Sequence, residues 1–313
     1  MEGVMMRGSK AMAVAVRHPE GHIVIHREPL NKFMYSGWLI RAPFLRGLVL
    51  LWDSLGLGMR SLFFSSNVAM EAEEFQDKNE TKEKPAAGES APTEVENVFD
   101  GPLAWGMVAV SLAFSIALFF LLPAFVTELL EKWLSIESAL LGNLIEGGIR
   151  LSLLIGYLGV IGFIPDIARV FAYHGAEHKT IMAYEAGAEL EPAVVSRYSM
   201  YHPRCGTGFL LTVVIISVLL FSLLGRPPLL LRLASRIVLI PIVSGIAYEY
   251  IKFTAKYQNL GIVRLITKPN LWLQRLTTRT PDLSMLQVSI TALNSVLEAE
   301  QSEEIQAETL SLG

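Results

Sequence analysis

The sequence predicts an all-α integral membrane protein with about four transmembrane helices, a small N-terminal β-hairpin and amphipathic cytoplasmic helices. Of its 313 residues, 52% are hydrophobic and only 18% are charged, and the mean hydropathy is +0.42. Soluble domains carry about a quarter charged residues, so this composition favours lipid surroundings. Several apolar segments near the middle of the chain are close to the ~20 residues that cross a bilayer.

The charge balance and the cysteine content exclude two other classes of protein. The net charge is −4, which provides no basic surface for nucleic acid, so no nucleic-acid partner is expected. Cys205 is the single cysteine, which rules out an internal disulfide framework. The first ten residues lack the apolar run of a signal peptide, so we expect internal segments to direct membrane insertion.

Residues 1–36 form the first predicted region, which contains the β-hairpin. Two runs rich in β-branched residues, at 13–16 and 22–25, are suited to strands. Between them, residues 18–21 have the sequence His-Pro-Glu-Gly, which is typical of a tight turn.

Residues 37–66 are predicted to form an amphipathic helix. Arg46, Asp53 and Arg60 recur at every seventh position, so a helix would place them in one narrow polar stripe on an apolar surface. This pattern favours a helix that lies in the membrane interface or packs against a bundle, because three central charges are costly in a span. Residues 67–101 follow as an acidic linker that is predicted to be disordered.

Residues 102–250 make up the predicted four-helix transmembrane domain. Glu146 and Arg150, spaced i and i+4 in the second span, are expected to pair near the interface. Basic residues are concentrated in the loop 165–205 and in both terminal regions, so the positive-inside rule predicts cytoplasmic termini. The four spans are expected at residues 103–126, 144–164, 206–224 and 229–250.

The tail, residues 251–313, is predicted to form amphipathic cytoplasmic helices. Pro269 and Pro281 lie where helices are expected to begin. We expect this tail to dock on the cytoplasmic face of the bundle. Together with the acidic linker, it is expected to offer surfaces for protein partners.

The loop between the second and third spans contains the residues with the clearest chemistry. His174, Glu177 and His178 form an H-x-x-E-H pattern. On a helix the two histidines are one turn apart and face the same way, which suits two imidazoles on one metal ion. Glu177 lies beside them, where it is placed to accept a proton from a metal-bound water.

Two further ligand types lie just before the third span. His202 and Cys205 are both good zinc ligands, and such a set favours zinc or iron over magnesium or calcium, which prefer oxygen. The alternatives are a helix with two surface histidines and no metal, and a buried Cys205 that serves as a small apolar side chain.

Two other groups of polar residues stand apart from this loop. Glu249, near the cytoplasmic end of the fourth span, is either a carboxylate at the metal site or an interfacial glutamate paired with Lys252 or Lys256. His18, His22 and His26 also have i, i+4 spacing, but their segment is predicted to be strand and turn, so the one-turn spacing of a helix does not bring them together and no metal is expected there.

Four motifs, in the same order over nearly the whole chain, resemble those of the YqhQ family of bacterial membrane proteins. The resemblance implies a location in the bacterial cytoplasmic membrane and a metal-dependent enzyme, an activity that is itself a prediction for the family. Members have a short stretch before the first motif, which implies further residues upstream of Met1. The motifs are E-G-V-M-M-R-G at 2–8, H-G-A-E-H-K at 174–179, H-P-R-C-G-T at 202–207 and L-W-L-Q-R-L-T-T-R at 271–279.

Both terminal motifs are expected on the cytoplasmic side, which suggests one site built from four distant stretches. Arg7 and Arg279 would then bind anions or carboxylates, for which the arginine fork is suited. The alternative is that they anchor the chain at lipid headgroups. The residues expected to gather near the histidine loop are Glu2, Arg7, Arg275 and Arg279.

The leading hypothesis is therefore a zinc-dependent membrane enzyme of the hydrolase type, with Glu177 as general base. The alternative is a non-enzymatic membrane scaffold or assembly factor, with a structural metal site or none. Transport is disfavoured, because the centres of the spans have almost no ionisable residues to mark a path. The metal would be held by His174, His178 and one of Cys205 or His202.

Overall fold

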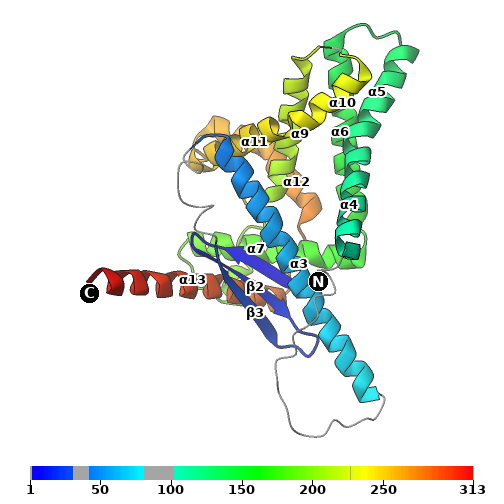
Figure 1. The fold of residues 1–313 in the computed structure, drawn as a ribbon. Helices are drawn as coiled ribbons and strands as arrows, with labels where there is room; N and C mark the ends of the chain where they lie inside the picture. The colour runs from blue at the N-terminus through cyan, green and yellow to red at the C-terminus, as the bar shows by residue number, and fades with distance from the viewer. Residues whose placement is uncertain (1, 31–41, 81–101, 226, 313) are drawn as a thin grey trace.

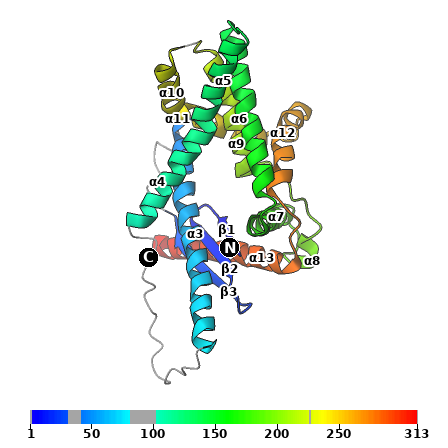
Figure 2. The same ribbon diagram turned by 90° about the vertical axis from the view of Figure 1, so that its right-hand side faces the viewer.

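The computed structural model describes residues 2–30, 42–80, 102–225 and 227–312, and the chain forms two layers. Figures 1 and 2 show apolar helices above a second layer, in which a small sheet is covered by helices that lie across it. The helices are α3 (Leu45–Glu80), α4 (Pro102–Ile116), the π-helical turn η1 (Ala117–Leu121), α5 (Leu122–Trp133), α6 (Ala139–Ile161), α7 (Pro165–Glu185), α8 (Pro192–Val195), α9 (Gly206–Ser222), α10 (Leu229–Val238), α11 (Ile240–Lys256), α12 (Gly261–Thr277) and α13 (Leu283–Leu312).

The sheet has three antiparallel strands in the order β1 (Gly3–Arg7), β2 (Ala11–Arg17) and β3 (Ile23–Pro29). The predicted hairpin is confirmed as β2 and β3, and the amide of His18 donates to the carbonyl oxygen of His22 at 2.8 Å. Gly21 in the turn has a φ of 97°, which glycine adopts without steric strain. β1 adds a strand to the prediction, because its sequence G-V-M-M-R has a single β-branched residue and gives a weak strand signal.

Both faces of β2 are buried, which makes it the centre of the lower layer. Ala13 and Ala15 belong to a core shared with α7, α8 and α13. Met12, Val14 and Val16 belong to a second core, on the side of α3. A strand buried on both faces has a continuous apolar run instead of an alternating one, as A-M-A-V-A-V does here.

Helix α3 extends beyond the helix predicted at 37–66. It continues to Glu80, within the segment predicted to be a disordered linker. Residues 37–41 of the predicted helix and 81–101 of the predicted linker lie outside the described residues.

The C-terminal helices depart from the prediction in two respects. α13 packs on the sheet and α7 instead of the bundle, because its apolar side, with Leu286 and Leu293, fits the alanine-rich face of β2. α12 does contact the apolar helices α6 and α9. Pro269 lies inside α12 instead of at its start, on an exposed face where its missing amide is tolerated. Pro281 precedes α13, as predicted.

Among the described residues, three helical segments are long and apolar enough to cross a membrane: Leu45–Met70, Ala109–Trp133 and Ala139–Ile161. α10 and α11, which are bent by 42° at their junction, form a fourth if the pair is one span. α9, predicted as a span, is shorter, with 17 residues. The segment predicted to lie in the interface is thus apolar enough to cross, although its Asp53 and Arg60 pair with side chains of the sheet.

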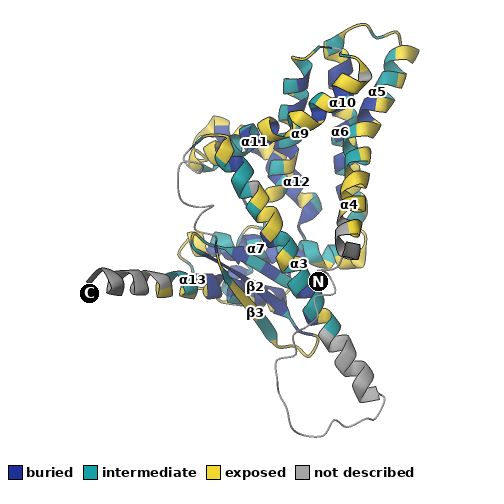
Figure 3. Ribbon diagram, in the orientation of Figure 1, coloured by how far each residue is buried: buried dark blue, intermediate teal, exposed yellow. Residues whose placement is uncertain are grey.

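Large apolar side chains cover the outside of the upper layer. Figure 3 shows exposed residues along α4, α5 and α10, whereas β2 is largely buried. Single soluble domains rarely expose so much contiguous apolar surface. Examples that are each at least 66% exposed are Val110, Phe114, Val160 and Leu230.

A buried group of charges joins the apolar helices. Glu146 of α6 accepts hydrogen bonds from Arg150 of the same helix at 2.8 Å and from Arg236 of α10 at 2.9 and 3.1 Å. All three side chains are at most 4% exposed. The predicted pair of Glu146 and Arg150 therefore exists, but it is buried and is shared with another helix.

The π-helical turn η1 supplies a further acceptor to this group. The carbonyl oxygen of Phe119 accepts a hydrogen bond from Nε of Arg150 at 3.0 Å. The guanidinium of Arg236 lies 4.0 Å from the centroid of the Phe221 ring, which allows a cation–π interaction. Buried charges need such partners, because water is not available to solvate them.

Glu146→Gln preserves the shape of the side chain and removes its charge. Arg150 and Arg236 would then lose the carboxylate that they share, so we expect a loss of about 3–5 kcal/mol in the free energy of unfolding. Thermal unfolding of the detergent-purified protein measures this loss. Glu128→Gln is the matched control, because Glu128 pairs with the exposed Lys132 and its loss should change stability little. Equal effects of the two substitutions would contradict a special role for Glu146.

Candidate metal centre

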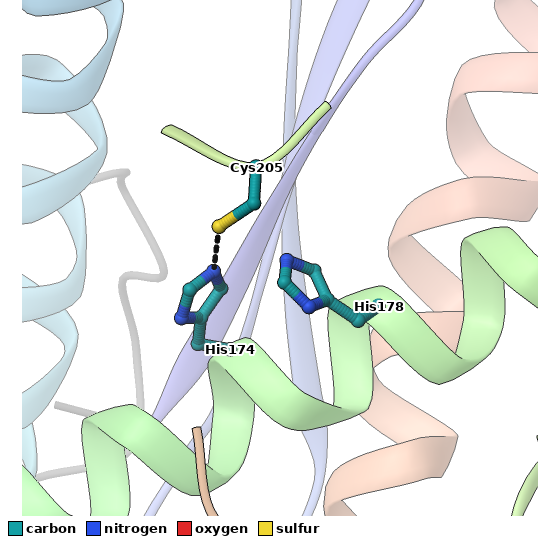
Figure 4. A group of neighbouring side chains, drawn as sticks. All are labelled: His174, His178 and Cys205. Atoms are coloured by element: carbon teal, nitrogen blue, oxygen red, sulfur yellow. Dashed lines mark hydrogen bonds between the residues drawn. The ribbon is translucent and has the colours of Figure 1, made fainter. Parts of the chain in front are cut away.

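Helix α7 places two predicted ligands on one face. Its first turn contains Pro165 and Asp166, residue types that favour a helix N-terminus. The imidazoles of His174 and His178 are one turn apart, with ring centroids separated by 4.3 Å. The H-x-x-E-H motif is therefore helical, and both rings lie on the side of α7 that faces Cys205 (Figure 4).

Backbone carbonyl groups orient both imidazoles. Nδ1 of His174 lies 2.9 Å from the carbonyl oxygen of Thr277, and Nδ1 of His178 lies 2.5 Å from that of Met200. A carbonyl oxygen only accepts hydrogen bonds, so each Nδ1 carries a proton and donates it. In the neutral ring, Nε2 then has a free lone pair, which is the state that metal binding requires.

Cys205 brings sulfur to the same place, from the residue that precedes α9. Its Sγ lies 3.3 Å from Nε2 of His174 and 3.0 Å from Oγ1 of Thr207. His174, His178 and Cys205 each offer one ligand atom, and these atoms all lie within 4.8 Å of one another. Ligand atoms in a tetrahedral zinc site are roughly 3.5 Å apart, so small movements would fit this group to zinc.

Lys179 ties the loop before α9 to α7. Its Nζ donates to the carbonyl oxygens of Ser196 and Tyr198, at 2.6 Å each. Burial lowers the pKa of Lys179. Lys179 follows the second histidine directly, so the helix that presents the imidazoles also fixes the loop that carries the thiol.

Gln274 of α12 holds the same loop from the other side. Its Oε1 accepts from the amide of His202 at 2.9 Å, and its Nε2 donates to the carbonyl oxygen of His202 at 2.8 Å. Gln274 and the carbonyl of Thr277 were not among the predicted site residues, although both lie in the C-terminal motif that carries the family resemblance. The presence of both residues in that motif was the signal from which their role near the site was predictable.

His202 lies beside the three ligating groups. Its Nδ1 accepts from the amide of Arg204 at 3.3 Å, so Nε2 carries the proton of the neutral ring and lies 3.6 Å from the carboxylate of Glu185. Its ring centroid is 5.9 Å from that of His178. Burial, with a smaller contribution from His178, lowers the pKa of His202 to about 4. Of the two alternatives for the third ligand, the geometry favours Cys205.

Glu177 is close to His174 but outside the group of ligand atoms. Its side chain is partly buried. Burial raises the pKa of Glu177, and His174 acts in the opposite direction. A carboxyl group with a raised pKa is a stronger base, so this placement suits a group that moves a proton without binding the metal.

The C-terminal motif lies directly on α7. The amide of Arg279 donates to the carbonyl oxygen of Phe171 at 2.9 Å. A Cβ at Gly175 would lie 2.3 Å from the carbonyl oxygen of Arg279, so this contact requires glycine. The Arg279 guanidinium donates to the carbonyl oxygens of Arg275 and Thr278 at 3.1 and 3.2 Å. Arg279 therefore lies next to the histidine helix, as the resemblance suggested.

The N-terminal motif reaches α7 through Glu2. The Glu2 carboxylate pairs with Arg169 and lies 3.4 Å from the hydroxyl of Tyr173. Arg7, in contrast, donates to the hydroxyl of Ser54 in α3 at 3.0 Å. The structure thus brings Glu2 to the histidine helix α7 and places Arg7 against α3.

Glu249 is bound by α3 and not by the metal centre. Its carboxylate accepts from Nε of Arg46 at 2.6 Å, pairs with a second nitrogen of the same guanidinium, and lies 3.4 Å from the amide of Phe44. Glu249 is not among the group of potential ligand atoms around His174, and Lys252 interacts with it only electrostatically. Arg46 at the start of α3 takes the place of the predicted lysine partners.

The prediction that the spacing of the N-terminal histidines does not put them on one face is wrong for His18 and His22. His18 and His22 stack with ring centroids 4.4 Å apart, because the tight turn brings the ends of β2 and β3 side by side. The carboxylate of Glu20 lies 3.7 and 3.8 Å from their Nδ1 atoms, which makes a second group of potential ligand atoms. Glu20 and His22 are exposed, unlike His178 and Cys205.

Comparisons with known proteins agree with the motif resemblance. The family model "Protein of unknown function (DUF1385)" matches residues 42–299. The "Uncharacterized protein YqhQ" of Bacillus subtilis (strain 168) is 33% identical over 306 residues, which cover 97% of this chain and 92% of that protein. No solved structure matches the chain. The chain therefore belongs to the YqhQ family.

Proposed function

We propose that this chain is a multi-pass protein of the bacterial cytoplasmic membrane that binds one zinc ion and acts as a hydrolase. One observation carries the proposal: two imidazoles, with their Nδ1 atoms held by backbone carbonyls, lie beside a thiol. Carbonyl groups bound to the far nitrogen of a histidine are typical of metal sites. Two nitrogens and one sulfur favour zinc over magnesium or calcium.

Three protein ligands leave one position of a tetrahedral zinc site open. Zinc bound there would supply Lewis-acid activation of water. Glu177 is placed to take a proton from that water, since it lies near His174 and has a raised pKa. The backbone of Arg279 lies on α7, and its guanidinium would bind an anionic part of the substrate. These roles favour hydrolysis of an ester or an amide.

Four membrane crossings account for the two layers. The proposed spans are α4 with η1 and α5, then α6, α9, and the pair α10 and α11, whereas α3 packs against both α11 and the sheet. The sheet, α7 and α13 share one core, so they must lie on the same side of the membrane. Two crossings between the sheet and α7, and two more before α13, satisfy this requirement. The basic residues of this layer favour the cytoplasmic side, and the exposed apolar side chains of the upper layer would contact lipid.

The zinc proposal predicts the metal content of four proteins purified in detergent without chelators. Wild type and Glu177→Gln should each retain about one zinc per chain, because Glu177 is not a ligand. His178→Ala should lose it. His22→Ala is the matched control and should retain it, because the exposed N-terminal group is not the proposed site. Elemental mass spectrometry measures all four.

Two results would contradict the zinc proposal. One is wild-type protein without stoichiometric metal, which would favour the scaffold alternative. The other is metal that persists in His178→Ala and disappears in His22→Ala, which would assign it to the N-terminal turn.

Gly175→Ala is expected to weaken zinc binding without changing a ligand. The added methyl group would meet the carbonyl oxygen of Arg279 and displace the segment whose Thr277 carbonyl orients His174. Loss of such an orienting group lowers metal affinity by roughly 10–100-fold. Competition with a chromogenic chelator measures the affinity. Gly159→Ala is the control, since a Cβ there meets nothing within 4 Å; equal affinities for the two variants would exclude this orienting contact.

A further inference from the structure

A groove of about 380 Å³ lies between α3 and the sheet. This volume is within the range of about 300–1,000 Å³ that is typical of small-molecule sites. Neither the candidate metal centre nor the buried charge group accounts for it. Its walls come from β1, β2, α3 and α7 and include Gly3, Met5, Leu55, Gly58, Leu62 and Val170.

The groove is apolar, with one polar group that has no partner. Ser61 donates its hydroxyl to the carbonyl oxygen of Leu57 at 2.8 Å, and Ser54 accepts from Arg7. Ser65 differs: it is 7% exposed, and its hydroxyl has no hydrogen-bond partner among the described residues. A molecule with an apolar body would suit this lining.

The size and position of the groove favour a hydrocarbon chain over a partner helix as its occupant. A partner helix, about 10 Å across, would fill 380 Å³ with roughly one turn, so the groove is too small for a docked helix. A single hydrocarbon chain is narrow enough. Leu55, which lines the groove, is 64% exposed, and Trp52, three residues earlier on α3, is 72% exposed; both belong to a segment apolar enough to enter a membrane. Such a surface contacts lipid.

Helix α7 connects the groove to the candidate metal centre. Val170 lines the groove, and His174 follows it by four residues. Residues at this spacing lie on the same side of a helix, about 6 Å apart along its axis. A chain held in the groove would therefore have a polar end close to the histidines.

We infer that the groove between α3 and β1 binds the acyl chain of a membrane lipid, which makes acyl esters or amides the substrate class of the proposed hydrolase. The reaction rests on the proposed function, whereas the binding does not. Water adds its oxygen to the acyl carbonyl carbon, and the bond from that carbon to the alcohol oxygen or amine nitrogen breaks. The proton taken by Glu177 passes to the leaving group, so the products are a fatty acid and an alcohol or amine.

A photocrosslinking experiment tests this binding. The probe is palmitic acid with a diazirine in its chain, added to the full-length protein in vesicles of phosphatidylethanolamine and phosphatidylglycerol. Mass spectrometry then quantifies crosslinks on the peptides that contain Met5 and Val170. Gly58→Leu should fill the groove and remove most of these crosslinks, because a Cβ at Gly58 meets nothing within 4 Å. Gly56→Leu is the matched control on the same helix, is equally unobstructed, and should retain them.

The outcomes separate this inference from the zinc proposal. Equal crosslinking in wild type, Gly58→Leu and Gly56→Leu, or none in wild type, would overturn the acyl-chain site. Loss of crosslinks in Gly58→Leu alone supports the acyl-chain site. If the same loss is found in protein that contains no zinc, the proposed reaction fails but the acyl-chain site stands.

Discussion

The close contact between Gly175 and the backbone of Arg279 determines how the two layers of this protein meet. A Cβ at Gly175 would lie 2.3 Å from the carbonyl oxygen of Arg279, so only glycine lets the chain after α12 lie on α7. That segment supplies the Thr277 carbonyl that orients His174. On its opposite side, α7 is buried against β1 and α13 through Ala172 and Ala176. The imidazoles are therefore held between two packed surfaces, which makes them less free than histidines on a loop.

A different interaction holds the upper layer together. Glu146, Arg150 and Arg236 join α6 and α10, and the π-helical turn η1 contributes the Phe119 carbonyl. Such groups add little net stability compared with well-packed apolar residues, but they are costly to break and they favour one arrangement of helices over others. The buried charges thus define the relative placement of the apolar helices, while the lower layer carries the groups with chemistry.

The sequence predicted those features that depend on local pattern. The turn at His18 to Gly21 and the helical H-x-x-E-H motif follow from short-range chemistry, and both are present. Contacts between distant segments could not be predicted in this way. Glu146 and Arg236 are 90 residues apart, and no periodicity links them. The bond between His174 and the Thr277 carbonyl involves a backbone atom, which leaves no trace in residue type. The stacking of His18 on His22 was missed because it arises from the tight turn, which brings residues four apart face to face at the ends of β2 and β3.

X-ray absorption at the zinc edge of the purified protein tests the central claim most directly, because it reports the atoms bound to the metal. The proposed site predicts one sulfur at about 2.3 Å and two or three nitrogen or oxygen ligands at about 2.0–2.1 Å. Cys205→Ser should remove the sulfur contribution and leave the nitrogen contribution of the imidazoles. A zinc spectrum without sulfur in the wild-type protein would show that the metal does not lie between His174, His178 and Cys205.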